Sequence, residues 1–414
     1  MVRIPTAEAR TSRAGSQRRR HDKAGVNAGD PQGMKGNREG SKLLPLEALR
    51  GGASMLVALY HFLLAFAPGV VGILPRVDNS HALVGTPWFA FVNGTAHVTT
   101  FFVLSGFVLS LKGLRENPTA AILDAAVKRW FRLAPIVCLS VLLSWALFHL
   151  GWFHFEDAAK LSRSDWLQHF GYGNLPQTYQ PGIFEALWQG SFTTFVFGKR
   201  SLNSNLWTMI WEFYGSFMVF ALAFLLRPRL RWLLWLLLVA AAAGLLLYPK
   251  SYLVPFLFGV AATALGIHRL KLNLPMAVLG LVGGLYLCGY WLPSGWYFWA
   301  QFLPFATEER AIVILSLGAF LLLVTFSSHN PMTAHLKGPV SRWLGNISFP
   351  LYLVHTLVIT SLASLVYAHV GGGTTGLWLA ALTTIAGCIP LVFVFALFDR
   401  WWMTVLRRWI IFRQ

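Results

Sequence analysis

The sequence predicts an all-α protein that crosses a membrane about ten times, with both termini in the cytoplasm. Two observations predict this class. Of the 414 residues, 56% are hydrophobic and only 12% are charged, and the mean hydropathy is +0.56. Soluble domains carry about 25% charged residues. The apolar residues also gather in runs that are long enough, or nearly so, to span a bilayer as helices.

Ten apolar runs are predicted to form the membrane helices. They cover approximately residues 46–67, 88–111, 132–151, 206–226, 232–248, 252–267, 274–292, 310–327, 344–369 and 376–397. The fifth and sixth runs are short and are separated only by Tyr248 to Ser251. We therefore expect these two to form a helical hairpin.

The basic residues support this topology. If the amino terminus is cytoplasmic and each run crosses once, 27 of the 34 Lys and Arg residues fall on the cytoplasmic side, counting Arg50 with the amino-terminal tail. Positive residues concentrate in cytoplasmic loops of membrane proteins. The protein is therefore expected in the cell inner (plasma) membrane with both termini inside. The same distribution favours contact with lipid headgroups over nucleic acid as the meaning of the net charge of +18.

Three regions follow from the composition. Residues 1–42 are polar and basic and are expected to be a disordered cytoplasmic tail. Residues 43–400 form the membrane domain, in which 152–205 is the longest outer segment and is expected to cap the outer face or hold an acceptor. Residues 401–414 are expected to be a basic cytoplasmic tail. Cysteine spacing indicates neither a metal nor a redox site, and no metal is predicted.

The first run contains two ionisable side chains that a membrane helix normally lacks. Arg50 and His61 are eleven residues apart, which on a helix is about three full turns and about 16 Å. Both side chains therefore face the same way, one at the membrane edge and one near its middle. Ionisable groups in a span usually mark a site or a pathway. A local ion pair between Glu47 and Arg50 is the structural alternative.

Glu212, in the fourth run, is expected at about the same membrane depth as His61. A carboxylate beside an imidazole could fix its tautomer and raise its basicity. The sequence therefore predicts an acid–base pair of these two residues. A hydrogen bond that only joins two helices is the alternative.

Three further polar residues lie within the runs. His355 is equally compatible with a buried packing role and with a functional one, whereas packing is favoured for His97. Ser105 lacks the glycine that a nucleophile elbow requires two residues earlier, so a small-residue helix contact is favoured.

A basic cluster precedes the third run. Lys128, Arg129 and Arg132 could be ordinary positive-inside charges. Alternatively, with Arg50, they could form a clamp for polyphosphate, which lysine and arginine bind through charge-assisted hydrogen bonds.

Together these motifs resemble the acyltransferase type 3 family over nearly the whole chain from Leu43. The motifs occur in the family's order. They are Leu49-Arg50-Gly51 with His61, Phe101-Phe102-Val103-Leu104-Ser105-Gly106-Phe107, Lys128-Arg129 with Arg132 and Pro135, Asn205-Leu206-Trp207-Thr208 with Glu212, and Leu344-Gly345-Asn346-Ile347-Ser348 with Tyr352 and His355.

The resemblance implies a membrane O-acyltransferase, foremost an O-acetyltransferase. Cytoplasmic acyl-CoA would be a co-substrate, with no tightly bound cofactor, and the acceptor would be a hydroxyl of an outer-side glycan or similar small molecule. His61, Glu212 and Arg50 would be catalytic, with His61 acting as general base or as a transient acyl carrier. Arg50, Lys128, Arg129 and Arg132 would bind the donor. A pore or acceptor path would be lined by His355, Asn205, Trp207, Ser105 and Tyr352.

Two other classes remain open at this stage. A transporter or flippase could use Arg50, His61 and Glu212 as a substrate or proton path, although the sequence shows no inverted repeat. A non-catalytic assembly factor would tolerate loss of His61 and Glu212.

Overall fold

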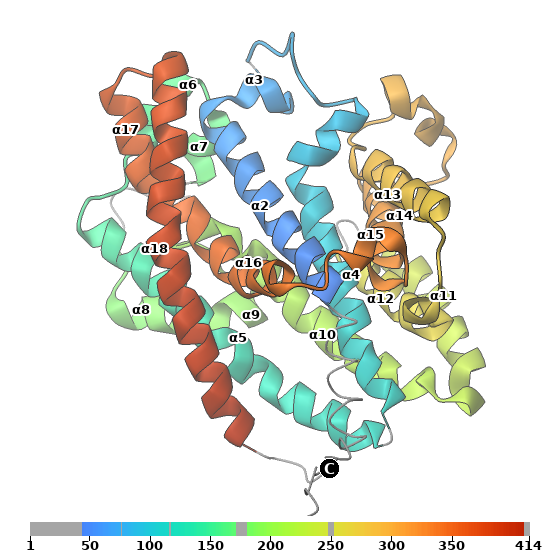
Figure 1. The fold of residues 1–414 in the computed structure, drawn as a ribbon. Coiled ribbons are helices and arrows are strands. Elements are labelled where there is room, and N and C mark those ends of the chain that lie inside the picture. Colours follow the sequence, from blue (N-terminus) through green and yellow to red (C-terminus); the bar gives the residue numbers. More distant parts are fainter. Residues whose placement is uncertain (1–43, 76, 116, 171–179, 247–251, 410–414) are drawn as a thin grey trace, which may run out of the picture. The chain divides into compact units, whose positions relative to one another are not determined.

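The computed structural model describes residues 44–75, 77–115, 117–170, 180–246 and 252–409. The tail expected at 1–42 and the last residues of the carboxy-terminal tail lie outside this part of the chain. The described residues form helices joined by loops and contain no strand, which confirms the all-α class (Figure 1).

Every predicted membrane run contains a helix. Within the part of the chain that the structure describes, seven helical segments are individually long and apolar enough to cross a membrane. They are α2 (Leu44–Phe66), α4 (Gly94–Ser110) with η2 (Leu111–Leu114), α5 (Pro118–His149), η4 (Ser204–Thr208) with α10 (Met209–Ala223) and η5 (Phe224–Leu226), α14 (Thr307–Ser327), α16 (Pro339–Val358) with η9 (Ile359–Ala363) and α17 (Ser364–His369), and α18 (Gly373–Arg408).

The other three predicted runs form shorter helices, so the number of crossings stays a prediction. These helices are α11 (Arg231–Leu246), α12 (Val254–Leu265) and α13 (Leu274–Cys288). The connections contain α3 (Pro68–Val71), η1 (Pro87–Val92), α6 (Phe155–Ser162), α7 (Asp165–Phe170), α8 (Ile183–Trp188), η3 (Gln189–Thr193), α9 (Thr194–Val196), η6 (Pro228–Leu230), η7 (Ile267–Arg269), η8 (Gly295–Phe302) and α15 (Pro331–Ala334).

Helix α5 begins well before the apolar run that predicted it. The Asn117 side chain accepts a hydrogen bond from the Ala120 amide at 3.4 Å, and Pro118 occupies the first turn, where its fixed φ suits a helix. Lys128 and Arg129 therefore lie on a helix and not in a loop. The charged residues of this first part lowered its hydropathy, which is why the apolar run marked only the later part.

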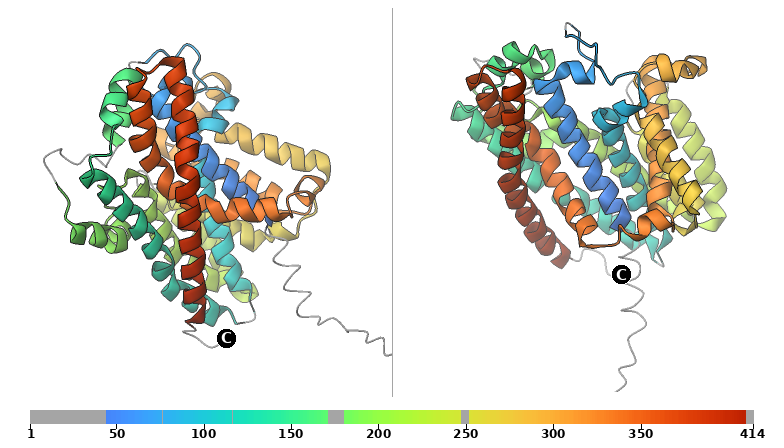
Figure 2. Two further views of the ribbon diagram at one scale, coloured as in Figure 1. Left: turned by 60° about the vertical axis from the view of Figure 1, so that its left-hand side comes forward. Right: turned by 45° about the horizontal axis from the view of Figure 1, so that its top comes forward.

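Helices α2 and α16 lie side by side (Figures 1 and 2). Glycine permits the approach at both contacts. A Cβ added to Gly51 would lie 2.5 Å from the Cβ of Leu344, and one added to Gly345 would collide with the Glu47 side chain. The close packing brings the side chains of the two helices into direct hydrogen-bonding range.

Helices α4 and α12 approach each other in the same way. Gly106 packs against the Phe256 backbone, and a Cβ on Gly259 would lie 2.5 Å from the Phe107 amide nitrogen. The small-residue contact expected at Ser105 is thus made by its neighbour, Gly106.

The segment 152–205 has two parts. Helices α6 and α7 cover the end of α2: the Ser164 hydroxyl donates to the Leu64 carbonyl at 2.5 Å, and the His154 amide donates to the Thr360 carbonyl at 3.1 Å. Figure 1 shows α3, α6, α7 and α17 at one end of the bundle, and the last turns of α18 at the other. Helix α8 and η3 instead pack along α5, where the Trp130 indole donates to the Ser191 carbonyl at 2.8 Å.

Candidate functional site

Two histidines meet where α2 packs against α16. His61 Nδ1 lies 2.8 Å from His355 Nε2, and the ring centres are 5.1 Å apart with planes inclined by 10°. Both side chains are buried, with 7% and 0% of their surface exposed. The second nitrogen of His355, Nδ1, lies 2.8 Å from the Leu351 carbonyl oxygen. The pair is the only His–His hydrogen bond in the described part of the chain.

Aromatic rings surround this histidine pair. The Trp166 ring, on α7, lies nearly parallel to the His61 ring with centres 5.2 Å apart, and the Tyr60 ring is equally close. On the other side, the Tyr352 ring centre is 6.1 Å from that of His355. Trp166 comes from the segment 152–205, so this segment reaches His61.

Glu212 does not bind His61, and the predicted acid–base pair is wrong. The Glu212 carboxylate forms an ion pair with Arg129 and accepts a hydrogen bond from the Ser105 hydroxyl at 2.8 Å. The prediction used only the depth of each residue in the membrane, and depth does not determine which helices are neighbours. Helix α10 packs against α4 and α5, whereas α2 packs mainly against α16.

Arg50 faces the same helix as His61, as the eleven-residue spacing predicted. Its guanidinium donates to the Ser348 hydroxyl at 2.9 Å and to the Gly345 carbonyl at 2.6 Å, both on α16. It also forms an ion pair with Glu47 at 2.7 Å. The local ion pair considered from the sequence is therefore present, and Arg50 joins two helices at the site's edge.

The Asn205 motif joins η4 to α16. The Asn205 amide donates to the Tyr352 carbonyl, and the Tyr352 hydroxyl donates back to the Asn205 carbonyl. The Tyr352 oxygen also lies 2.7 Å from the Thr208 hydroxyl oxygen. These bonds fix α16 in register with η4. Trp207 points to Tyr252, with ring centres 5.0 Å apart.

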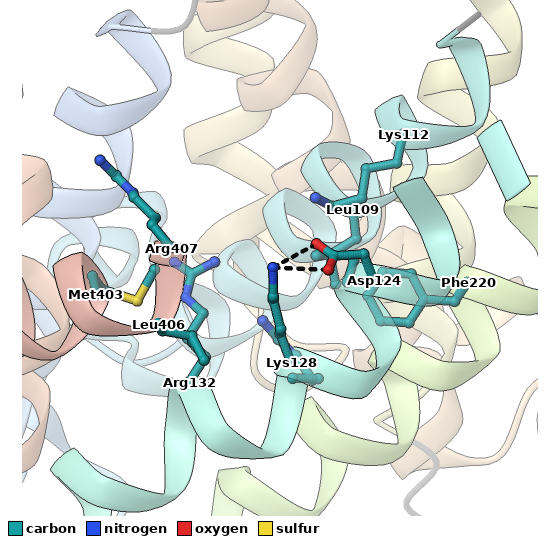
Figure 3. Close-up of a pocket in the computed structure, with 11 residues that line it drawn as sticks. Leu109, Lys112, Asp124, Lys128, Arg132, Phe220, Met403, Leu406 and Arg407 are labelled. Atoms are coloured by element: carbon teal, nitrogen blue, oxygen red, sulfur yellow. Dashed lines mark hydrogen bonds and ion pairs between the residues drawn. The ribbon is translucent and has the colours of Figure 1, made fainter. Parts of the chain in front are cut away.

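A pocket opens between the start of α5 and the end of α18, beside η2 and α10 (Figure 3). Its volume is about 230 Å³. Five of the side chains that line it are basic and one is acidic: Lys112, Lys128, Arg129, Arg132, Arg407 and Asp124. The structure thus brings Lys128, Arg129 and Arg132 together at one cavity, as expected for a clamp, and leaves Arg50 outside its lining.

We call this cavity the phosphate pocket. Its basic residues differ in whether an acidic side chain already neutralises them. Lys128 is paired with Asp124 at 2.8 Å, and Arg129 is paired with Glu212. Among the ion pairs recorded within the described residues, none includes Lys112, Arg132 or Arg407. These three are the basic side chains of the pocket without such a pair, and Figure 3 shows Arg132 between Lys128 and Arg407.

Comparison with family models decides the class of the protein. The model of the acyltransferase domain, type 3, matches residues 44–398, nearly the whole chain. The chain belongs to this acyltransferase family. Neither the comparison with curated proteins nor that with solved structures gave a match. The protein is therefore an acyltransferase, and its long apolar helices make it a multi-pass membrane protein.

In this acyltransferase, two side-chain contacts lie on the helices that join the phosphate pocket to the histidine pair. Arg129 lines the pocket and binds Glu212 on α10. Thr208, one turn before Glu212, contacts the Tyr352 hydroxyl, and Tyr352 precedes His355 by one turn of α16. The Arg129–Glu212 ion pair and the Thr208–Tyr352 hydrogen bond thus each hold a residue that lies one turn from the next along its helix.

Sequence reasoning missed Lys112, Arg407 and Trp166 as site residues of the acyltransferase. Lys112 lies just beyond the second apolar run and Arg407 just beyond the last, where each resembles any other positive residue at a membrane edge. Trp166 lies in a segment with many aromatic residues. No local signal distinguishes these three, because their role depends on which helix ends meet.

Proposed function

We propose that this acyltransferase moves an acyl group, foremost acetyl, from acyl-CoA to a hydroxyl group of a glycan or similar small acceptor. The observation that carries the proposal is the phosphate pocket, with three cations that have no ion-pair partner among the described residues. Coenzyme A carries a diphosphate and a 3′-phosphate, which Lys and Arg bind with charge-assisted hydrogen bonds.

The size of the phosphate pocket fits one end of such a donor. Pockets that bind drug-sized ligands have volumes of about 300–1,000 Å³, and this pocket has about 230 Å³. It would therefore hold the phosphates and leave the acyl-bearing arm to extend along the helix bundle. The Arg129–Glu212 and Thr208–Tyr352 contacts support a course for that arm toward His61.

The histidine pair supplies the base. His61 would take the proton from the acceptor hydroxyl while the hydroxyl oxygen attacks the thioester carbonyl. The carbon–sulfur bond then breaks, and the thiolate of coenzyme A leaves and takes up the proton from the His61 imidazolium. The products are an ester and free coenzyme A, so atoms and charge balance.

A thiol-release assay tests this function. Purified full-length protein in detergent is incubated with acetyl-CoA and a panel of sugars, and the free thiol and the acetylated sugar are measured. We expect turnover by the native protein and none by His61→Ala, with unchanged thermal unfolding. His97→Ala, a change at another buried histidine on a neighbouring helix, serves as control and should retain activity. Full activity of folded His61→Ala would exclude His61 as base.

The donor is tested by removing one phosphate. Acetyl-dephospho-CoA lacks the 3′-phosphate but keeps the thioester. We expect its KM to exceed that of acetyl-CoA, because fewer charge-assisted hydrogen bonds can form with the phosphate pocket. Equal KM values for the two donors would contradict recognition of the 3′-phosphate there.

A further inference from the structure

We propose that His355 is a positioning residue that fixes the proton of His61 on Nδ1, so that Nε2 of His61 is the nitrogen that accepts the hydroxyl proton. This inference rests on the proposed function, in which His61 is the base. It gives His355 the task that sequence reasoning had assigned to Glu212.

The first step is the protonation of His355 itself. Its Nδ1 lies 2.8 Å from the Leu351 carbonyl oxygen. A carbonyl oxygen can only accept a hydrogen bond, so Nδ1 carries the hydrogen. The side chain is fully buried, and burial favours the uncharged ring. In an uncharged ring with a proton on Nδ1, Nε2 carries a lone pair.

The second step transfers this constraint to His61. His355 Nε2 lies 2.8 Å from His61 Nδ1. Because His355 Nε2 is an acceptor, His61 Nδ1 must donate, and the neutral His61 ring then carries its lone pair on Nε2. One backbone carbonyl thus determines the tautomer of both rings.

The ring geometry agrees with such a bond. The 2.8 Å between the two bonded nitrogens, added to the distance of each nitrogen from its own ring centre, equals the 5.1 Å between the ring centres. The bond therefore lies along the line that joins the two centres. The planes are inclined by only 10°. The N–H of one ring therefore points at the in-plane lone pair of the other, and the rings meet edge to edge and not face to face.

The backbone around His355 holds this arrangement. Tyr352, one turn earlier, is fixed by its bonds to Asn205 and Thr208. At the other end of the contact, Arg50 joins α2 to Ser348 and Gly345 of α16. The first set of bonds holds α16 in place beside His355, and the second holds α2 against α16, so the two rings keep a fixed separation.

The consequence for the reaction is a base that needs no carboxylate. When His61 Nε2 accepts the hydroxyl proton, Nδ1–H still donates to His355 Nε2, and this bond strengthens because the donor is now charged. The same bond holds the imidazolium until its proton passes to the leaving thiolate.

Two substitutions at one position test the positioning role. Glutamine at 355 offers a side-chain oxygen that can accept from His61 Nδ1–H, whereas leucine offers no acceptor. We expect His355→Leu to lower kcat for acetyl transfer by about 10²-fold or more and His355→Gln to recover part of it. The KM for acetyl-CoA should be unchanged in both, because the phosphate pocket is built from other helices. His97→Gln, at a buried histidine bonded to the Ala90 carbonyl, is the matched control and should leave kcat unchanged.

Nitrogen NMR of protein labelled with ¹⁵N-histidine gives a readout independent of activity. His61 is assigned by loss of its signals in His61→Gln. We expect a protonated Nδ1 and an unprotonated Nε2 in the native protein, and a shift toward the Nε2–H tautomer in His355→Leu. Either a protonated Nε2 in native protein or full kcat in folded His355→Leu would overturn the proposal. Activity of folded His61→Ala would instead refute the base of the proposed function, and the tautomer measurement would remain valid.

Discussion

At the scale of single residues, ion pairing separates structural cations from those that can bind a ligand. Arg129 and Arg132 lie one turn apart on α5, and both line the phosphate pocket. Arg129 is buried and neutralised by Glu212. Arg132 is exposed, and no acidic side chain in the described part of the chain forms an ion pair with it. The two arginines therefore have different effects when they are replaced.

Arg132→Gln is expected to raise the KM for acetyl-CoA by about tenfold to a hundredfold, with little change in kcat or stability. The reason is the loss of one charge-assisted hydrogen bond, which contributes about 1.5–3 kcal/mol. Steady-state kinetics with donor and acceptor varied separately checks this expectation. Arg229→Gln, an exposed arginine in η6, is the control, and a donor KM unchanged in Arg132→Gln would refute the clamp.

Arg129→Gln is expected to destabilise the protein by about 3–5 kcal/mol, because it leaves the mostly buried Glu212 carboxylate without its cation. The side chains of the pair are only 7% and 14% exposed. Thermal unfolding in detergent measures the effect. The double variant Arg129→Gln with Glu212→Gln should recover most of the loss, and a double variant less stable than Arg129→Gln would show that the pair does not act as a unit.

At the scale of helices, the contact between α2 and α16 decides whether the histidines meet. The contact depends on glycine, since Gly51 packs on Leu344, and Gly345 packs on Glu47. The adjacent glycine, Gly52, has no neighbouring atom within 4 Å of an added Cβ. One helix thus carries a glycine that the contact requires and another that it does not.

Gly51→Ala is expected to lower stability by about 1–3 kcal/mol, as overpacking does, and to lower kcat by separating His61 from His355. Gly52→Ala is the matched control and should stabilise the protein slightly, because alanine favours a helix by about 1 kcal/mol over glycine. Thermal unfolding and acetyl transfer are measured for both variants. Equal effects of the two substitutions would mean that the close approach is not what holds the histidines together.

At the scale of the whole molecule, the phosphate pocket combines distant parts of the sequence. Lys112 follows α4, Arg132 lies on α5, and Arg407 lies at the end of α18. Helices α6 and α7 cover the carboxy-terminal end of α2 and bring Trp166 to His61. The phosphate pocket and the histidine pair are thus built from different sets of elements.

The topology predicted from the basic residues places the phosphate pocket in the cytoplasm. Single cysteines introduced at Arg229 and at Lys160, in a protein whose natural cysteines are replaced, test it. An impermeant maleimide should label Lys160→Cys in intact cells with a permeable outer envelope, and Arg229→Cys only after the inner membrane is opened. Labelling in the reverse order would refute the predicted orientation.

The sequence alone determined the class of the protein and the positions of its helices. Long apolar runs must be helical in a bilayer, because no water is present to satisfy a backbone in another conformation. The ordered motifs also indicated the acyltransferase family, and the spacing of Arg50 and His61 placed both side chains on one face of the first membrane helix. These properties depend on local composition and on helix geometry.

Only the tertiary structure decided which polar groups are partners. Membrane depth can be calculated from a position along a helix, but the neighbour of that helix and its rotation depend on packing between distant segments. Glu212 therefore met Arg129 and Ser105, while His61 met His355. The cost of leaving a buried polar group without a partner makes these pairings definite, and the glycine contacts that select them act between helices far apart in the sequence.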